Sequence, residues 1–181
     1  TRQNGGDGIY GASGSTLIEN ASTDNGGSGI VVGSGSTIAL NSVDANDGDG
    51  ISCFMQCTIR QNTVRNSGGV GIETGTEASI SENTVSSSGA EGILASTSAT
   101  VIGNASNGNV GNGIQTGNAS TVRNNTANSN SSGNGLDVGT GSNVSGNTAR
   151  SNFGFGLKAE STGVGFSGNV FGNNAGGSAS P

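Results

Sequence analysis

A two-residue motif, Gly followed by Ile or Leu, recurs along almost the whole 181-residue chain at a nearly constant interval. The interval is 21 residues six times and 22 residues once. The eight pairs are Gly8-Ile9, Gly29-Ile30, Gly50-Ile51, Gly71-Ile72, Gly92-Ile93, Gly113-Ile114, Gly135-Leu136 and Gly156-Leu157. Eight copies in register identify a repeat protein, in which each unit stacks on its neighbours.

The composition alone leaves two alternatives, and the repeat decides between them. Gly, Asn, Ser and Thr make up 105 of the residues, whereas Leu, Ile, Val and Phe make up 34. So few large apolar residues indicate either a disordered linker or a fold that uses Gly and Asn in quantity. Since a disordered linker gives no reason for eight copies in register, we expect the folded alternative.

The charged residues and the hydropathy pattern exclude further classes of protein. Six basic residues against twelve acidic ones give a net charge of −6, which argues against a nucleic-acid partner. No stretch is apolar enough for a membrane span, and no signal peptide is recognisable at the start. We expect an extracellular or cell-surface protein, secreted with a signal peptide that is absent from this chain.

Each repeat contains three short segments in which apolar and polar residues alternate, separated by Gly, Ser and Asn. Alternation with period two is typical of half-buried strands. Strands this short, with no helix between them, predict a chain that winds three strands per coil. Coils stacked at ~4.8 Å would form a rod of about 40 Å. We therefore expect one all-β domain over residues 1–181, with regular coils over about 4–173 and a Gly/Ala/Ser tail over 174–181.

An Asn occupies the same position in every repeat, three residues after an aliphatic or aromatic residue. These are Asn20, Asn41, Asn62, Asn83, Asn104, Asn125, Asn147 and Asn169. Stacked Asn side chains can bond both their own turn and the next Asn, which satisfies buried polar groups that otherwise cost about 1–3 kcal/mol each. We predict an internal Asn ladder with a structural role, in which the preceding residue adopts a left-handed conformation.

The segments "NGIQTGNASTVRNNTANS", "GIETGTEASISENTVSS" and "NGLDVGTGSNVSGNTARS" resemble the right-handed parallel β-helix repeat of pectate-lyase-like, NosD-like and surface proteins. The resemblance extends over about residues 4 to 173. It implies a right-handed, single-stranded β-solenoid of about eight 21-residue coils. It leaves the activity open, because such repeats occur in lyases, hydrolases, epimerases and structural rods.

Catalysis has little support in the sequence. The period uses the whole chain, so no long loop remains to line a cleft, and the chain has no His and one Lys. One outward column places Gln115, Asp137 and Lys158 on successive coils, with Glu160 two residues further on. Asp137, Lys158 and Glu160 would form a contact for an acidic sugar or, more simply, an exposed ion pair.

Asp7, Asp47 and Asp49 lie in Gly-rich segments that resemble half of a calcium-binding nonapeptide. True calcium β-rolls repeat such an Asp every nine residues, and this chain does not. We therefore expect no cofactor and no dedicated metal site, with surface calcium as an incidental alternative.

One outward column of hydroxyl side chains raises the hypothesis of an ice-binding face. Its members are Thr16, Thr37, Thr58, Ser79, Thr100 and Thr121. Ice binding normally needs two flat parallel columns, and the flanking column here mixes Ile, Ala, Ser and Arg. Thr also simply favours strands, so ice binding ranks third among the hypotheses.

Cys53 and Cys57 are expected to point inward across one bend. A disulfide across that bend and two buried thiols are the alternatives, and a disulfide would fit an oxidising compartment. Three Asn-x-Ser/Thr sites, at Asn118, Asn130 and Asn143, are expected in turns and would carry glycans in a host that glycosylates.

Neither end of the chain shows a recognisable cap, so we expect a larger parent chain or self-association through the ends of the solenoid. Phe153, Phe155, Phe166 and Phe171 gather in the last coil, as a plug for the core or as an end-face contact. The leading hypothesis is a non-enzymatic rod, either a filament subunit or an adhesin shaft. The alternative is a polysaccharide-binding or polysaccharide-cleaving β-helix.

Overall fold

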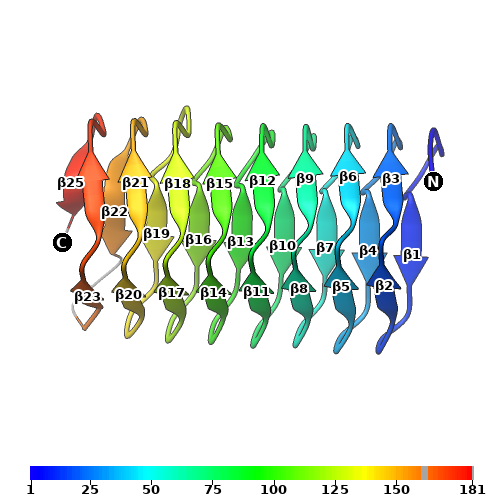
Figure 1. The fold of residues 1–181 in the computed structure, drawn as a ribbon, viewed down its shortest axis with the longest axis horizontal. Helices are drawn as coiled ribbons and strands as arrows, with labels where there is room; N and C mark the ends of the chain where they lie inside the picture. The colour runs from blue at the N-terminus through cyan, green and yellow to red at the C-terminus, as the bar shows by residue number, and fades with distance from the viewer. Residues whose placement is uncertain (160–162, 181) are drawn as a thin grey trace.

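The computed structural model describes residues 1–159 and 163–180 and has the architecture of a single parallel β-solenoid. All elements in these residues are strands, and each strand pairs in parallel with the strand one coil away. The three strands of a coil belong to three different sheets, which run along the axis of the rod (Figure 1). The predicted all-β fold with three strands per coil is therefore confirmed.

Sheet 1 contains the strands that begin at the Gly-Ile motif. Its nine strands, in spatial order, are β1 (Ile9–Gly11), β4 (Ile30–Val32), β7 (Ile51–Cys53), β10 (Ile72–Thr74), β13 (Ile93–Ala95), β16 (Ile114–Thr116), β19 (Leu136–Val138), β22 (Phe155–Ala159) and β25 (Gly177–Ser180).

Sheet 2 contains the second strand of each coil. Its eight strands are β2 (Thr16–Ile18), β5 (Thr37–Ala39), β8 (Thr58–Arg60), β11 (Ser79–Ser81), β14 (Thr100–Ile102), β17 (Thr121–Arg123), β20 (Asn143–Ser145) and β23 (Gly165–Ser167).

Sheet 3 contains the third strand, which leads back toward sheet 1. Its eight strands are β3 (Ala21–Thr23), β6 (Ser42–Asp44), β9 (Thr63–Arg65), β12 (Thr84–Ser86), β15 (Ala105–Asn107), β18 (Thr126–Asn128), β21 (Thr148–Arg150) and β24 (Val170–Gly172).

The core is a narrow column of side chains, each stacked on its equivalent in the next coil. In sheet 1, Ile30 pairs with Ile51, and Ile51 pairs with Ile72, and none of the three is exposed. The same stacking in sheet 2 buries Ile38 and Ile59 completely. Because each apolar side chain is covered on both sides by another coil, a chain with few large apolar residues still forms a continuous core.

The predicted Asn ladder is present and runs the length of the rod. Asn62 donates from its backbone N–H and its side-chain amide to Asn83 Oδ1, both at 2.9 Å. Asn83 repeats both bonds to Asn104, at 2.9 and 3.0 Å, and also donates to the Ile59 carbonyl at 3.0 Å. The preceding residue is left-handed, as expected, with φ of 57° at Gln61. The ladder therefore turns the backbone between sheets 2 and 3, and its members from Asn41 to Asn147 are at most 2% exposed.

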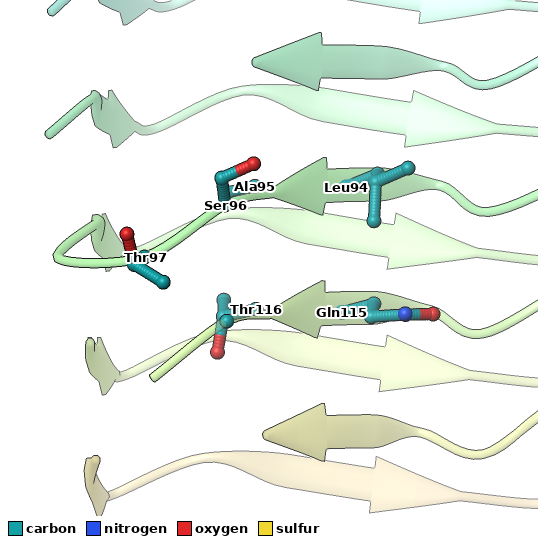
Figure 2. Close-up of a pocket in the computed structure, with 7 residues that line it drawn as sticks. Leu94, Ala95, Ser96, Thr97, Gln115 and Thr116 are labelled. Atoms are coloured by element: carbon teal, nitrogen blue, oxygen red, sulfur yellow. The ribbon is translucent and has the colours of Figure 1, made fainter. Parts of the chain in front are cut away.

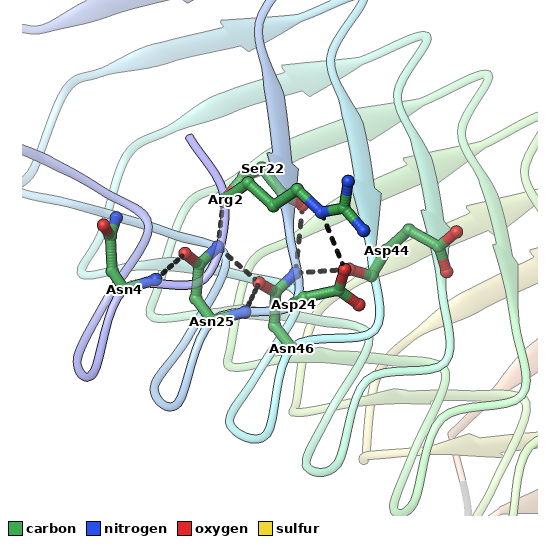
Figure 3. Close-up of polar contacts among 7 residues, drawn as sticks. All are labelled: Arg2, Asn4, Ser22, Asp24, Asn25, Asp44 and Asn46. Carbon is green, nitrogen blue, oxygen red and sulfur yellow. Dashed lines mark hydrogen bonds and ion pairs between the residues drawn. The ribbon is translucent and has the colours of Figure 1, made fainter.

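A second internal ladder, which the sequence analysis did not identify, lies at the turn between sheets 3 and 1. Asn25 donates from its side chain to Asn46 Oδ1 at 2.7 Å and to Ser22 Oγ at 3.1 Å (Figure 3). Two coils replace the Asn by Ser67 and Ser88, whose buried hydroxyls have no hydrogen-bond partner among the described residues. Its Asn members are Asn25, Asn46, Asn109, Asn130, Asn152 and Asn174.

The end of the chain differs from the sequence-based prediction. The sequence predicts regular coils over about 4–173 and a Gly/Ala/Ser tail over 174–181, but β25 (Gly177–Ser180) pairs with β22 within that tail and begins a ninth coil. Ala179 lies opposite Leu157, where the other coils have Ile or Leu. A small residue at that position hid the repeat, because the aliphatic column was the pattern that defined it. No helix among the described residues is both long and apolar enough to cross a membrane.

Candidate functional site

The outward surface of sheet 1 is the surface with the most varied side chains, and it is called the sheet 1 face here. One column is formed by the residue after each Gly-Ile or Gly-Leu pair: Tyr10, Val31, Ser52, Glu73, Leu94, Gln115, Asp137 and Lys158. A second column is formed by the residue before each pair: Asp7, Ser28, Asp49, Val70, Glu91, Asn112, Asn134 and Phe155. Strand pairing thus aligns residues 21 or 22 apart into two neighbouring columns along the rod.

Gln115, Asp137 and Lys158 lie on adjacent strands in the register that the sequence predicts. Lys158 Nζ lies 3.2 Å from Asp137 Oδ2, and the same oxygen accepts a bond of 3.2 Å from the Asn134 amide. The Asp137 residue is 7% exposed, so its carboxylate is largely occupied by these two partners. Glu160, the third member of the predicted sugar contact, lies outside the described residues. The ion-pair interpretation therefore describes this part of the face.

A pair of carboxyl groups, Asp49 and Glu73, lies on the same face nearer the N-terminus. Partial burial raises the pKa of Glu73, and the hydrogen bond to Asp49 and repulsion from the Asp49 charge raise it further. Asp49 also accepts the Val70 backbone N–H at 2.8 Å, which fixes its position. The sequence analysis considered Asp49 for calcium alone and missed Glu73, although Glu73 occupies the column of Gln115 and Asp137.

Two shallow hollows lie where sheet 1 turns toward sheet 2. The first has a volume of about 270 Å³ and is lined by Ser52, Cys53, Phe54, Glu73, Thr74, Gly75 and Ser96. The second, of about 260 Å³, is lined by Leu94, Ala95, Ser96, Thr97, Gln115, Thr116 and Gly117 (Figure 2). Because they share Ser96, the hollows are adjacent along the rod. Leu94 and Gln115 lie on adjacent strands in the second.

Phe54 is the aromatic residue of the first hollow, and its side chain is 68% exposed. Cys53 and Cys57, on either side of it in sequence, are buried and joined as a disulfide, with Cα atoms 6.5 Å apart. Of the two alternatives in the sequence analysis, the structure has the disulfide. Closing this five-residue loop restricts the backbone that carries Phe54 outward.

The charges are divided unequally among the sheets. Lys158 is the one basic residue on the sheet 1 face, and it is paired with Asp137. The five Arg residues lie elsewhere: Arg60 and Arg123 on sheet 2, Arg65 and Arg150 on sheet 3, and Arg2 bridged to Thr23 beside sheet 3. The sheet 1 face is therefore negatively charged over the coils that contain the first hollow.

Two of the three Asp residues of the calcium hypothesis accept a hydrogen bond from the backbone. Asp7 Oδ1 accepts the Ser28 backbone N–H at 2.8 Å, and Asp49 Oδ1 accepts the Val70 backbone N–H at the same distance. Asp47 is exposed. The part of the chain that the structure describes contains no group of three or more His, Cys, Asp or Glu arranged to hold a metal ion.

The three predicted glycosylation sites differ in accessibility. Asn118 lies in a turn, as predicted, and is exposed, whereas Asn143 is exposed but is the first residue of β20 and not part of a turn. Asn130 is completely buried, where its amide donates to Asn152 Oδ1 at 2.8 Å as part of the second ladder. The prediction for Asn130 is wrong, because the turn at that position points its side chain into the solenoid.

The four Phe residues of the last full coil do not form one cluster. Phe153 projects from a turn and is 67% exposed, whereas Phe155 is half-buried. Phe166 and Phe171 occupy the inward columns of sheets 2 and 3, and Phe171 packs against the core. Phe166 is 64% exposed, since the described residues include no further sheet 2 strand beyond it.

The predicted hydroxyl column on sheet 2 is aligned in register over six coils. Thr16 pairs with Thr37, and Thr37 pairs with Thr58. The flanking column includes Ile18 and the bulky, exposed Arg60. Ice binding stays a prediction that no observation here tests.

Solved structures with a similar fold include two epimerase modules and a tailspike protein. The mannuronan C-5 epimerase AlgE4 A-module of Azotobacter vinelandii aligns with a TM-score of 0.75 and 16% identity, over 92% of this chain and 55% of that one. The AlgE6 A-module of the same organism aligns with a TM-score of 0.51 and 15% identity, over 87% and 59%. The Dettilon tailspike protein (gp208) gives 0.52 and 11%, over 94% and 60%. At these identities the similarity establishes the fold alone.

This chain spans between 55% and 60% of the length of those three structures. No curated protein matches the sequence. The family model described as "Right handed beta helix region" matches residues 1–76 and 68–180. The matched residues include almost the entire chain, so the protein belongs to the right-handed β-helix family.

Proposed function

We propose that the chain is a non-enzymatic structural rod, the shaft of an extracellular or cell-surface protein or a subunit of an end-to-end filament. The observation that supports this role is the regularity of the coils. Successive coils keep the same three strands in register, and the internal Asn ladder connects them with repeated bonds of about 3 Å. Such a rod resists bending and holds whatever is attached to its ends at a fixed distance.

The open shape of the two hollows described above also favours a mechanical role. The two hollows are shallow and share a residue, and they contain no nucleophile paired with a base. The Glu73 carboxyl group, which lines the first hollow, is hydrogen-bonded to Asp49.

The assembly state of the purified chain tests this proposal. Negative-stain electron microscopy and sedimentation over a range of concentrations should reveal uniform rods whose length increases with concentration if the chain is a filament subunit. The Phe166→Asp substitution should stop that growth, because Phe166 is exposed in the last strand of sheet 2, whereas Phe153→Asp, on a lateral turn, should not. Rods of constant length favour the shaft over the filament, and turnover of a polymer would refute the structural role.

A second candidate function is the binding of a polysaccharide on the sheet 1 face. It is favoured by the first hollow, where exposed Phe54 lies beside the Glu73 carboxyl group. An aromatic side chain beside a few fixed polar groups is the usual composition of a small-molecule site.

A panel of soluble polysaccharides tests the second candidate. Binding is measured by calorimetry, and cleavage by the release of reducing ends and of unsaturated products from uronate polymers. Binding that Phe54→Ala abolishes would support it. If no polysaccharide binds at millimolar concentration, the candidate is wrong.

A further inference from the structure

We infer that the hollow beside Phe54 binds a linear glycan containing free amino sugars, whose ammonium groups pair with the carboxylates of the sheet 1 face. The inference rests on the second candidate function, glycan binding, and adds the chemical class of the ligand.

The coils around Phe54 depart from the pattern that the rest of the rod follows. The second ladder loses its Asn side chains at Ser67 and Ser88, whose buried hydroxyls have no partner among the described residues. Thr74, which lines the hollow and is 3% exposed, has a hydroxyl without a partner as well. Natural proteins depart from local structural rules mainly at functional sites. Thr116, which lines the second hollow, has such a hydroxyl too, so the irregularities lie on the coils that contain the two hollows.

Phe54 is positioned to contact a ligand rather than the core. Its neighbours Cys53 and Cys57 point inward and are bonded to each other, so the loop between them holds the ring out into solvent. The residues 21 positions before and after Phe54, which stack on it in the neighbouring coils, are Gly33 and Gly75. Neither has a side chain that could cover the ring. An aromatic ring accommodates the C–H face of a sugar and attracts an ammonium group through its π electrons.

The charge of the face selects among glycans. Asp49, Glu73 and Glu91 lie on the coils at the hollow, whereas four of the five Arg lie on the other two sheets and Arg2 lies beside sheet 3. A uronate polymer would place its carboxylates against carboxylates, and like charges at an interface disfavour binding. A glycan with protonated amines instead forms charge-assisted hydrogen bonds to these groups.

The spacing of the coils suits an extended polymer. The two hollows share Ser96 and follow each other along the axis, with Leu94 and Gln115 in the second. Coils that stack at about 4.8 Å repeat at nearly the length of one sugar residue in an extended chain. Successive sugars therefore meet equivalent positions on successive coils.

The test compares three linear oligosaccharides of equal length by calorimetry, over a pH series from mildly acidic to neutral, because binding needs protonated amines and an ionised Glu73, whose pKa is raised. They are β-1,4-linked oligoglucosamine, its fully N-acetylated form and an oligouronate. We expect oligoglucosamine to bind most tightly, with an affinity that falls as salt increases. Phe54→Ala and Glu73→Gln should each weaken the affinity for oligoglucosamine about tenfold. The first substitution removes one stacked ring, and the second removes one charge-assisted hydrogen bond.

Matched controls separate this site from general charge effects. Phe153→Ala removes an equally exposed Phe, and Glu82→Gln removes an exposed carboxylate at the turn between sheets 2 and 3, so both should bind like the unmodified chain. Circular dichroism checks that every variant is folded.

The possible failures are distinguishable. If the acetylated or uronate oligosaccharide binds at Phe54 as tightly as oligoglucosamine, the inference is wrong and glycan binding stands. If none of the three binds, the inference is overturned, and the polysaccharide panel decides whether glycan binding fails with it. If Glu82→Gln weakens binding as much as Glu73→Gln does, the attraction is diffuse and the assigned site is wrong.

Discussion

The substitution Asn83→Ala tests the energetic role of the internal Asn ladder at its centre. Asn83 Oδ1 accepts two bonds from Asn62, and the Asn83 amide donates to the carbonyls of Ile59 and Ser81, at 3.0 Å each, and to Asn104 Oδ1. Both neighbouring ladder residues are 1% exposed, so water cannot replace the lost partners. The substitution therefore leaves buried groups without their partners.

The expected loss follows from those contacts. The buried Asn62 N–H loses its acceptor at 2.9 Å, which costs about 1–3 kcal/mol, and each lost bond to a carbonyl adds about 1 kcal/mol. We expect Asn83→Ala to lower the free energy of unfolding by about 3–5 kcal/mol, a large share of the 5–15 kcal/mol that is typical of folded proteins. Asn118→Ala is the control, because exposed Asn118 accepts a single backbone bond at 2.9 Å, and it should cost less than about 1 kcal/mol.

Two measurements check the prediction. Chemical denaturation compares the variants, and hydrogen exchange follows the Asn62 amide directly, which matters because a repeat protein need not unfold in one step. In the unmodified chain the Asn62 amide should exchange slowly, and in Asn83→Ala it should exchange faster than amides several coils away. Equal destabilisation by Asn83→Ala and Asn118→Ala, with the Asn62 amide still protected, would refute the argument.

Three further predictions concern single positions. Because burial and a neighbouring carboxylate raise the pKa of Glu73 above its ordinary value of 4.5, the folded chain keeps this proton to higher pH than the unfolded chain. The free energy of unfolding should therefore fall as the pH rises above 4.5. Denaturation of the Glu73→Gln variant, measured at a series of pH values, should lack the part of this fall that comes from Glu73. Leu40 is exposed and has a φ of 58°, a left-handed conformation that is strained for Leu and easier for Asn. Leu40→Asn should therefore raise the free energy of unfolding by about 1 kcal/mol in denaturant titrations, and a decrease would contradict this explanation. A Cβ at Gly71 would lie 2.5 Å from a backbone oxygen, so Gly71→Ala should lower the melting temperature by several degrees. Gly14→Ala is the comparison, because a Cβ at Gly14 would have no atom within 4 Å and the substitution tests the backbone conformation alone.

The fold was predictable because its determinants repeat. The Gly-Ile pairs and the Asn column each occur once per coil, so eight copies reveal a pattern that any single copy would hide. The second ladder was missed because Ser67 and Ser88 interrupt its column, and the ninth coil because Ala179 replaces the aliphatic residue. Each miss falls where the repeated residue changes while the backbone does not.

The candidate site was predictable only in part. The register of Asp137 and Lys158 follows from the period, because residues 21 apart must lie on adjacent strands. The hollow beside Phe54 is lined by residues of three successive coils, where Phe54 replaces a small residue and Glu73 meets Asp49 from the preceding coil. A contact between different columns of different coils has no repeated signal, so the sequence pattern could not indicate it.

The internal Asn ladder also gives the rod a direction. In each step the residue nearer the N-terminus donates and the residue nearer the C-terminus accepts, as from Asn41 to Asn62 and from Asn62 to Asn83. Counting the Asn-to-Asn bonds of the ladder alone, a break between two coils would leave the donors on the N-terminal fragment and the acceptors on the C-terminal one. Two such fragments can rejoin in one orientation only, and reversed pairing would set like groups against each other. The solenoid is therefore polar in the sense of a filament, with two chemically different ends at every cross-section.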